Sequence, residues 1–340
     1  MHIFSKLKHP WRFKCLNVAV SLLFLVSFVA ATILGASCSE KDPYAGLGTT
    51  FPMTLTDDLG RTVTLDKVPQ RIVSLAPSNT EILFALGLGD KVVGDTLYCD
   101  YPVAAQDVTK VGGFSEIDIE IVITLEPDII LAEDIHKTNT IPALEGLGFT
   151  VFALVPHNLD EIMDSVITIG RLTGTMDEAK TIASDMKKRI KNVTDKVATL
   201  KADQKPNVLH VLWADAGIMS YGVNTPIYDV ITKAGGVSLV QSGNGFPTLS
   251  LEYVIAANPM VVICDVDSSY PGGDYTLILM QSDERFKDME ARLSGRVYGI
   301  DADLTNRSGP RIVDALEWVA AILHPEIFPD FAGKYLPAGS

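Results

Sequence analysis

The sequence is short of the residues that catalysis by metals or activated nucleophiles requires. Its 340 residues include six histidines and four cysteines, and no histidines stand at the spacing of a zinc site. No Gly-x-Ser-x-Gly elbow surrounds Ser78, and Gly87-Leu-Gly89 lacks the third glycine of a dinucleotide-binding loop. One alternative is an extracytoplasmic enzyme. The sequence offers no motif for the nucleophile, metal centre or nucleotide site that such an enzyme would need.

Positive charge is also scarce. Acidic residues outnumber basic ones by 42 to 28, which gives a net charge of −14. Residues 1–37 contain four basic and no acidic residues, so the rest of the chain has a net charge of −18. Such an acidic chain is expected to avoid nucleic acid and anionic membrane surfaces. It suits docking on a basic protein partner.

The first 37 residues have the layout of an export signal. A basic start is followed by an apolar run over residues 16–36, which ends in Leu34-Gly35-Ala36-Ser37-Cys38. The end of this run resembles a bacterial lipobox, in which the cysteine becomes the lipidated first residue, although the leucine stands one place early. We expect a signal peptide at 1–37 and a lipidated tether at 38–51; the alternative is an uncleaved membrane anchor. Both interpretations place the rest of the chain outside the cytoplasm, on a membrane.

Beyond the tether, short apolar runs alternate with amphipathic stretches, which predicts α/β lobes with parallel sheets covered on both faces. Ser78 and Glu81 have the spacing of a capping box at a helix start. The strands are expected at residues 72–75, 92–94, 128–132, 150–154, 208–213, 261–264 and 297–300.

Residues 158–203 interrupt this alternation. They hold no strand-like run and predict two helices, at 160–172 and at 176–200. The second would be roughly 37 Å long at 1.5 Å per residue, and its polarity suggests a helix that connects domains. We therefore expect an N-terminal lobe at 52–175, a linker helix with its exit at 176–205 and a C-terminal lobe at 206–335.

An internal repeat supports two similar lobes. Residues 118–131 (DIEIVITLEPDIIL) align without a gap with residues 250–263 (SLEYVIAANPMVVI). Each copy holds a capping residue, a glutamate in the first helical turn, a proline and a buried strand. Cys99 and Cys264 then fall in different lobes and are expected to be free thiols, because a bridge would hinder opening.

Three segments resemble the class III periplasmic binding proteins, which serve ABC importers of cobalamin, iron–siderophores and haem. They are residues 71–87 (RIVSLAPSNTEILFALG), residues 92–102 with VVGD and YCDYP, and residues 306–311 (NRSGPR). The resemblance covers about residues 52–330. It implies two Rossmann-like lobes joined by a single long α-helix, with a ligand cleft between them. It also implies an extracytoplasmic protein with no catalytic or metal site and no permanent cofactor, which works with a permease dimer and its ATPase subunits.

The YCDYP loop most resembles the cobalamin-binding members, so a corrinoid is the expected ligand; an iron–siderophore or haem is the alternative. A corrin needs aromatic faces and a few polar groups at the ends of strands. Arg307 and Arg311 could hold an acidic group, and Arg311 could equally brace its loop. Tryptophan is frequent in this family where Phe114 and Phe246 stand. The expected ligand contacts are Tyr98, Tyr101, Phe114, Trp213, Phe246 and Arg307.

Glu120 and Glu252 stand at the same place in the two copies of the repeat. A glutamate in a first helical turn stabilises the helix dipole by about 0.3–1 kcal/mol, which by itself explains their presence. The family resemblance implies a second role, in which one surface glutamate on each lobe docks on arginines of the permease dimer.

The proposed anchor can be tested by labelling cells with a radioactive or clickable fatty acid. We expect Cys38→Ala to abolish the lipid label, because Cys38 is the cysteine that follows the lipobox-like residues 34–37. A variant with Cys15→Ala, in the basic start of the signal, is the control and should keep the label. If the Cys38→Ala variant keeps the label, Cys38 is not the residue that anchors the protein.

Overall fold

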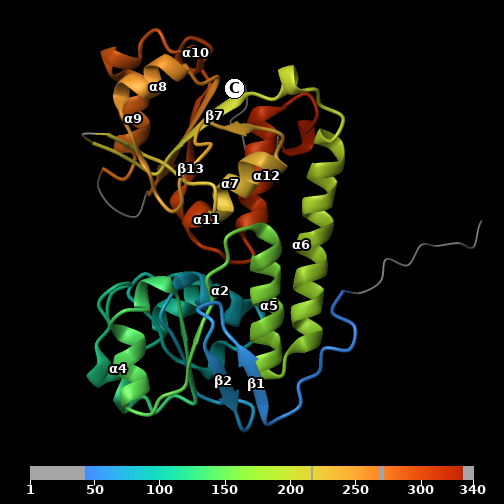
Figure 1. Ribbon diagram of the computed structural model, residues 1–340, viewed down its shortest axis with the longest axis vertical. Helices are drawn as coiled ribbons and strands as arrows, with labels where there is room; N and C mark the ends of the chain where they lie inside the picture. Colours follow the sequence, from blue (N-terminus) through green and yellow to red (C-terminus); the bar gives the residue numbers. More distant parts are fainter. Residues whose placement is uncertain (1–42, 216, 268–271, 332–340) are drawn as a thin grey trace, which may run out of the picture. The chain divides into compact units, whose positions relative to one another are not determined.

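The computed structural model describes residues 43–215, 217–267 and 272–331 (Figure 1). Cys38 and the expected signal peptide lie outside the described residues. From Leu47 onward the chain forms one compact unit. Among the described residues, no helix combines the length and the apolar character that crossing a membrane would require.

The first lobe contains a four-stranded parallel sheet in the order β4-β3-β5-β6. An antiparallel hairpin of β1 and β2, which the sequence patterns did not predict, precedes it. The elements are β1 (Met53–Thr56), β2 (Thr62–Leu65), β3 (Ile72–Ser74), α2 (Pro77–Ala85), β4 (Val92–Gly94), α3 (Ile119–Thr124), β5 (Ile129–Ala132), α4 (Thr140–Gly146) and β6 (Val151–Ala153).

The second lobe contains a parallel sheet in the order β10-β7-β12-β13 and a small antiparallel sheet in the order β11-β9-β8. Its strands are β7 (Asn207–Val211), β8 (Trp213–Ala214), β9 (Ile218–Met219), β10 (Val237–Ser238), β11 (Thr248–Leu249), β12 (Val261–Val266) and β13 (Val297–Asp301). Its helices are α7 (Pro226–Lys233), α8 (Leu251–Ala257), α9 (Tyr275–Ser282), α10 (Glu290–Leu293), α11 (Ala302–Asn306) and α12 (Ile312–Leu323).

The two parallel sheets share one topology, which confirms the α/β class and the duplication. In each, the strands lie in the order second, first, third, fourth along the chain. The repeat corresponds to α3 with β5 and to α8 with β12, and each helix is capped by the side chain of the residue just before it, Asp118 or Ser250. Even an unusual backbone position recurs: Glu126 and Asn258, 132 residues apart, both have φ of +44°.

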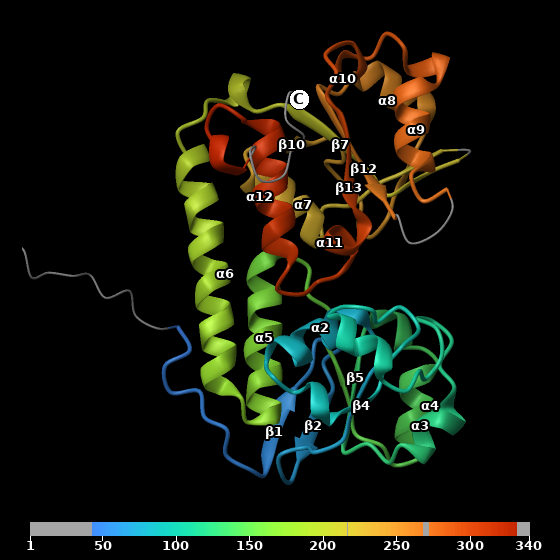
Figure 2. The same cartoon turned by 180° about the vertical axis from the view of Figure 1, so that it is seen from behind.

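Two helices, α5 (Leu159–Thr173) and α6 (Met176–Val197), follow the first lobe and precede the second. Gly174, with φ of +78°, ends α5 in the left-handed conformation that glycine adopts without strain. Close packing joins the helices, since a Cβ at Gly170 would lie 2.4 Å from that of Ala179. As Figures 1 and 2 show, α6 lies along α5 and also contacts α7 and α12 of the second lobe.

The long helix differs from the expectation in two ways. It ends at Val197 instead of residue 200, so its 22 residues span about 33 Å. Its side chains are also less evenly polar around the helix than its composition suggested. One stripe, at intervals of three and four residues, is buried: Ala179, Ala183, Met186, Ile190, Val193 and Val197. The helix therefore contributes to a packed interface along its length.

The expected capping box at Ser78 is wrong. Helix α2 starts with Pro77, and its N-cap, Ala76, offers no side-chain acceptor. Proline suits the first helical position because its missing N–H would be unpaired there anyway. Ser78 and Glu81 therefore lie inside the helix, where both side chains find partners from distant parts of the chain. The expected free thiols are confirmed, since Cys99 and Cys264 are unbridged and buried.

Candidate functional site

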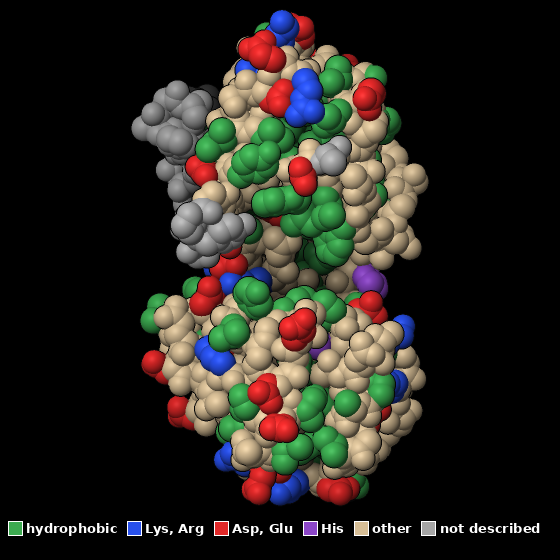
Figure 3. Space-filling model, turned by 90° about the vertical axis from the view of Figure 1, so that its left-hand side faces the viewer, with side chains coloured by type: hydrophobic (Ala, Val, Ile, Leu, Met, Phe, Trp, Pro, Cys, Tyr) green, Lys and Arg blue, Asp and Glu red, His purple; other side chains and the backbone are tan. Residues whose placement is uncertain are grey.

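The strand order places a cavity at the carboxyl ends of the first sheet. In open parallel sheets, ligands bind where neighbouring strands send their connections to opposite faces, which here is between β3 and β5. A cavity of about 630 Å³ opens there, within the roughly 300–1,000 Å³ typical of small-molecule sites. Figure 3 shows the surface hollowed between the lobes, with hydrophobic side chains on the second lobe beside the hollow.

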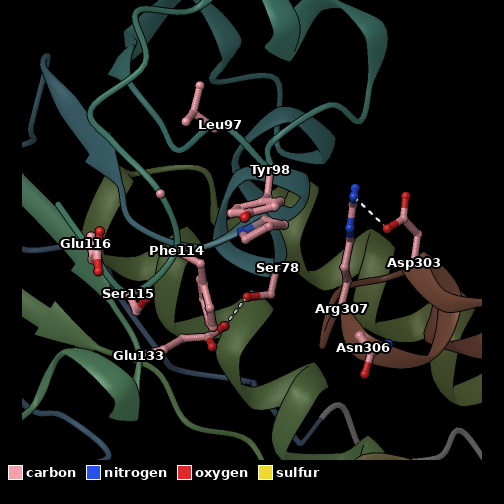
Figure 4. A pocket seen from close by; sticks show the side chains of 12 residues that line it. Ser78, Leu97, Tyr98, Phe114, Ser115, Glu116, Glu133, Asp303, Asn306 and Arg307 are labelled. Carbon is pink, nitrogen blue, oxygen red and sulfur yellow. Dashed lines mark hydrogen bonds and ion pairs between the residues drawn. The ribbon is translucent and has the colours of Figure 1, made fainter. Parts of the chain in front are cut away.

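Both lobes contribute to the lining of this cavity. Figure 4 shows Tyr98, Phe114 and Glu133 of the first lobe, with Asp303, Asn306 and Arg307 of the second lobe on another side. The complete lining is Pro77, Ser78, Leu97, Tyr98, Gly113, Phe114, Ser115, Glu116, Glu133, Asp303, Asn306 and Arg307.

Buried polar groups hold the loop that carries Tyr98. Lys110 Nζ donates hydrogen bonds to Asp95 Oδ1 at 2.8 Å, to the Cys99 carbonyl at 3.0 Å and to the Ala105 carbonyl at 2.9 Å. Burial raises the pKa of Asp95 to about 7, although Lys110 opposes the shift. The side chain of Cys99 is buried, so the loop is fixed at its middle while Tyr98, 60% exposed, projects from it.

A buried histidine links two parts of the cavity wall. His136 Nδ1 accepts the backbone N–H of Glu133 at 3.1 Å, and its Nε2 donates to the Phe114 carbonyl at 2.8 Å. Burial lowers the pKa of His136, which favours the neutral ring that this pairing needs. The Ser78 hydroxyl donates to Glu133 Oε1. Burial raises the pKa of Glu133, and Ser78 opposes the rise.

Arginines of the second lobe reach the first lobe across the cleft. Glu81 of α2 is 3% exposed. Its carboxylate accepts hydrogen bonds from Arg311 Nε at 2.9 Å, from Arg311 Nη2 at 2.5 Å and from Arg307 Nη1 at 3.4 Å. Arg307 also pairs with Asp100 and with Asp303, each at 2.6 Å. The positive charge of Arg307 is thus already balanced within the protein, although its side chain lines the cavity.

A second, smaller cavity of about 230 Å³ lies at the strand ends of the second lobe and shares Asn306 with the first. Asp265 of β12 is one of its lining residues; its side chain is buried and accepts four hydrogen bonds. The donors are His210 Nε2 at 2.8 Å, Thr305 Oγ1 at 2.9 Å, Asn306 Nδ2 at 3.2 Å and the Tyr221 hydroxyl. Burial next to Asp265 raises the pKa of Tyr221, so this phenol stays protonated. The network fixes Asn306 where the two cavities meet.

The structure brings some of the expected ligand contacts together and separates others. Tyr98, Phe114 and Arg307 line the larger cavity, and Trp213 lines the smaller one. Tyr101 lines neither, because the Arg311 guanidinium stacks 3.8 Å above its ring centroid. Phe246 is 56% exposed and packs edge-on against Tyr221 at 5.8 Å, also outside both linings. Arg311 binds Glu81 of the first lobe and so contributes to the contact between the lobes.

Glu120 and Glu252 lie where the repeat predicted. Both are exposed in the first turn of their helices, α3 and α8. Neither lines the two cavities.

Sequence reasoning missed Ser78, Glu133 and Asn306 as cavity residues. Glu133 directly follows the expected strand 128–132, so its position beyond a strand end was a usable signal. Ser78 and Asn306 had no comparable signal, because their neighbours in the cavity come from other parts of the chain.

The lining suits a large ring without free negative charge. Tyr98 and Phe114 offer aromatic faces, and Asn306 and Ser78 offer polar groups. Glu116, Glu133 and Asp303 are acidic, and burial raises the pKa of Asp303 to about 6 against the pull of Arg307. Within the described residues, no group of three or more potential metal ligands occurs.

Comparison with known proteins gives one family. The family model described as "Periplasmic binding protein" matches residues 72–304. A cobalamin-binding protein of Halobacterium salinarum is 30% identical over 81% of this chain and 74% of its own length. An uncharacterized ABC transporter substrate-binding lipoprotein of Bacillus subtilis, YvrC, is 29% identical over 89% of this chain and 97% of its own length. The crystal structure of a periplasmic heme-binding protein from Pseudomonas aeruginosa superposes with a TM-score of 0.67 at 28% identity, over 76% of this chain and 94% of that chain.

The shared carboxylate of Glu81 generates a stability prediction. Glu81→Ala should lower the free energy of unfolding by about 3 kcal/mol, because it leaves two partly buried guanidinium groups without their common partner. Asp195→Ala removes an exposed partner of Lys191 and should cost less than about 0.5 kcal/mol. Urea denaturation followed by circular dichroism measures both. Equal effects would mean that the cluster between the lobes contributes no more than a surface ion pair.

Proposed function

The chain belongs to the periplasmic binding protein family, and we propose that it captures a corrinoid outside the cytoplasm and delivers it to the permease of an ABC importer. As a substrate-binding protein of such an importer, it is a transport protein and not an enzyme. Its partners are the permease and ATPase subunits of the transporter.

The corrinoid proposal rests on the chemistry of the larger cavity. A corrin is a broad, partly apolar ring fringed with amides, so it can stack on Tyr98 and Phe114 while its amides bond to polar side chains. The one arginine in the lining, Arg307, is already paired with acidic residues. An anionic ligand would therefore meet three carboxylates and no unpaired cation among the lining residues.

Haem is the second candidate, and a specific residue favours it. A tyrosine oxygen is one of the groups that bind haem iron in proteins, and Tyr98 lines the cavity with an exposed side chain. The solved heme-binding relative is consistent with that choice. Against it stands the acidic lining, because the two propionates of haem would lie near Glu116, Glu133 and Asp303.

Anchoring and docking complete the proposed cycle. Lipid on Cys38 would hold the protein at the membrane, where its permease lies. Glu120 and Glu252, at equivalent places on the two lobes, would contact basic residues of the two permease subunits. The lipoprotein relative from Bacillus subtilis supports the anchored form.

Calorimetric titration with cyanocobalamin tests the ligand. We expect saturable one-to-one binding, and Tyr98→Ala should weaken it about tenfold or more because a large aromatic face is lost. Tyr253→Ala is the control, since Tyr253 is exposed on α8 and lines neither cavity. If cyanocobalamin does not bind and added haem shows a shifted Soret band, the ligand is haem and the corrinoid proposal is wrong.

Uptake by membranes that contain the partner permease tests docking. Glu120→Ala and Glu252→Ala should each leave ligand affinity within about twofold and reduce uptake, and the double variant should lose most uptake, because charge pairs at an interface act mainly on association. Added salt should weaken docking of the wild type more than that of the double variant. Glu178→Ala, at the exposed start of α6, is the control. Normal uptake by the double variant would mean that neither glutamate takes part in docking and that both only stabilise the first turn of their helices.

A further inference from the structure

Glu133 and Asp265 are related by the internal repeat, because they lie 132 residues apart at the carboxyl ends of β5 and β12. Their surroundings differ. Asp265 accepts hydrogen bonds from four side chains. The carboxyl of Glu133 accepts one, from Ser78, among the residues that the structure describes. The carboxylate of the second lobe is therefore fully used within the protein, whereas that of the first lobe is not.

The free part of Glu133 is Oε2, which takes part in none of the hydrogen bonds between described residues. The side chain lines the cavity, and Figure 4 shows its carboxyl beside Ser78 and Phe114. Its position is fixed at two points, since Ser78 binds Oε1 and His136 Nδ1 binds the backbone N–H at 3.1 Å. The cavity thus contains a carboxyl oxygen with a set position and an open bonding capacity.

An oxygen of this kind distinguishes an amide from a carboxylate. An ionised carboxyl accepts the N–H of an amide, and a protonated one donates to the amide oxygen, so an amide fits either state. A ligand carboxylate can only be accommodated if a proton is added, because two like charges in a partly buried site repel strongly. Burial, which raises the pKa of Glu133, also reduces the solvent screening of that repulsion.

We propose that Glu133 is the specificity-determining residue of the larger cavity, and that it selects ring ligands fringed with amides over ring ligands fringed with carboxylates. This inference rests on the proposed function. It identifies the side-chain groups at the edge of the ligand ring as the part that the site recognises.

The other carboxylates of the lining are less suited to this role. Asp303 Oδ1 lies 2.6 Å from Arg307, so its charge is largely balanced. Glu116 is exposed, and water screens its charge. Glu116 is therefore a matched control, because Glu116→Gln removes one negative charge from the same cavity without altering the fixed oxygen.

The experiment compares cyanocobalamin with its derivatives in which one side-chain amide is hydrolysed to a carboxylate, by calorimetric titration of the full folded protein. Wild-type protein should bind at least one monocarboxylate about tenfold or more weakly than cyanocobalamin. Glu133→Gln should reduce that difference to less than about threefold, and Glu116→Gln should keep it. Glutamine retains an acceptor for Ser78, so the variant is expected to fold, and an unchanged midpoint of thermal unfolding verifies this.

Each outcome separates the inference from the proposed function. If cyanocobalamin binds but every monocarboxylate binds equally well, Glu133 does not select and the inference is wrong, while the corrinoid function stands. If Glu116→Gln restores the monocarboxylate as well as Glu133→Gln does, the discrimination comes from the general charge of the cavity. If cyanocobalamin does not bind the wild-type protein, the corrinoid function fails and the inference fails with it.

Discussion

The buried carboxylate of Glu81 joins the two lobes. It lies in α2 of the first lobe and binds Arg311 and Arg307 from the start of α12 and the end of α11. Taking such charges out of water costs several kcal/mol each unless they stay paired, so while the lobes are packed together here the carboxylate and the guanidinium groups must remain in contact. The carboxyl ends of both sheets therefore remain at one cleft. Arg307 also pairs with Asp100 and Arg311 stacks on Tyr101, which ties the loop that carries Tyr98 to this cluster.

The ion cluster also affects the charge of the cavity wall. An arginine at a cleft would ordinarily attract phosphate or carboxylate. Here the positive charge is used to connect the lobes, and the other side chains of the lining are aromatic, aliphatic, uncharged polar or acidic. The proposed preference for an uncharged, amide-rich ring follows from this division of charge, and not from the net charge of the chain as a whole.

The two lobes share one architecture but differ at the carboxyl ends of their sheets. Strand order, helix capping and even the left-handed backbone positions at Glu126 and Asn258 recur. The carboxylates at the strand ends do not behave alike, because Asp265 is surrounded by donors that immobilise Asn306, whereas Glu133 faces the cavity with one partner. In the proposed function, the second lobe supplies a fixed wall and Glu133 of the first lobe supplies the recognition group.

Periodicity, glycines and prolines are local properties, and they determined the α/β class, the repeat, the two lobes and the helix pair between them. They also placed Tyr98 and Phe114 beyond predicted strand ends, and the family resemblance added Arg307, in the loop before the last helix; all three line the larger cavity. Local spacing could not decide the partners of Ser78, Glu81 and Tyr101. Ser78 bonds to Glu133, 55 positions away, and Glu81 bonds to Arg311, 230 positions away. Such pairings depend on how the sheets twist and how the lobes pack. Only the tertiary structure could therefore show that Ser78 belongs to a cavity wall and that Glu81 belongs to the contact between the lobes, and that the two do not form a capping box.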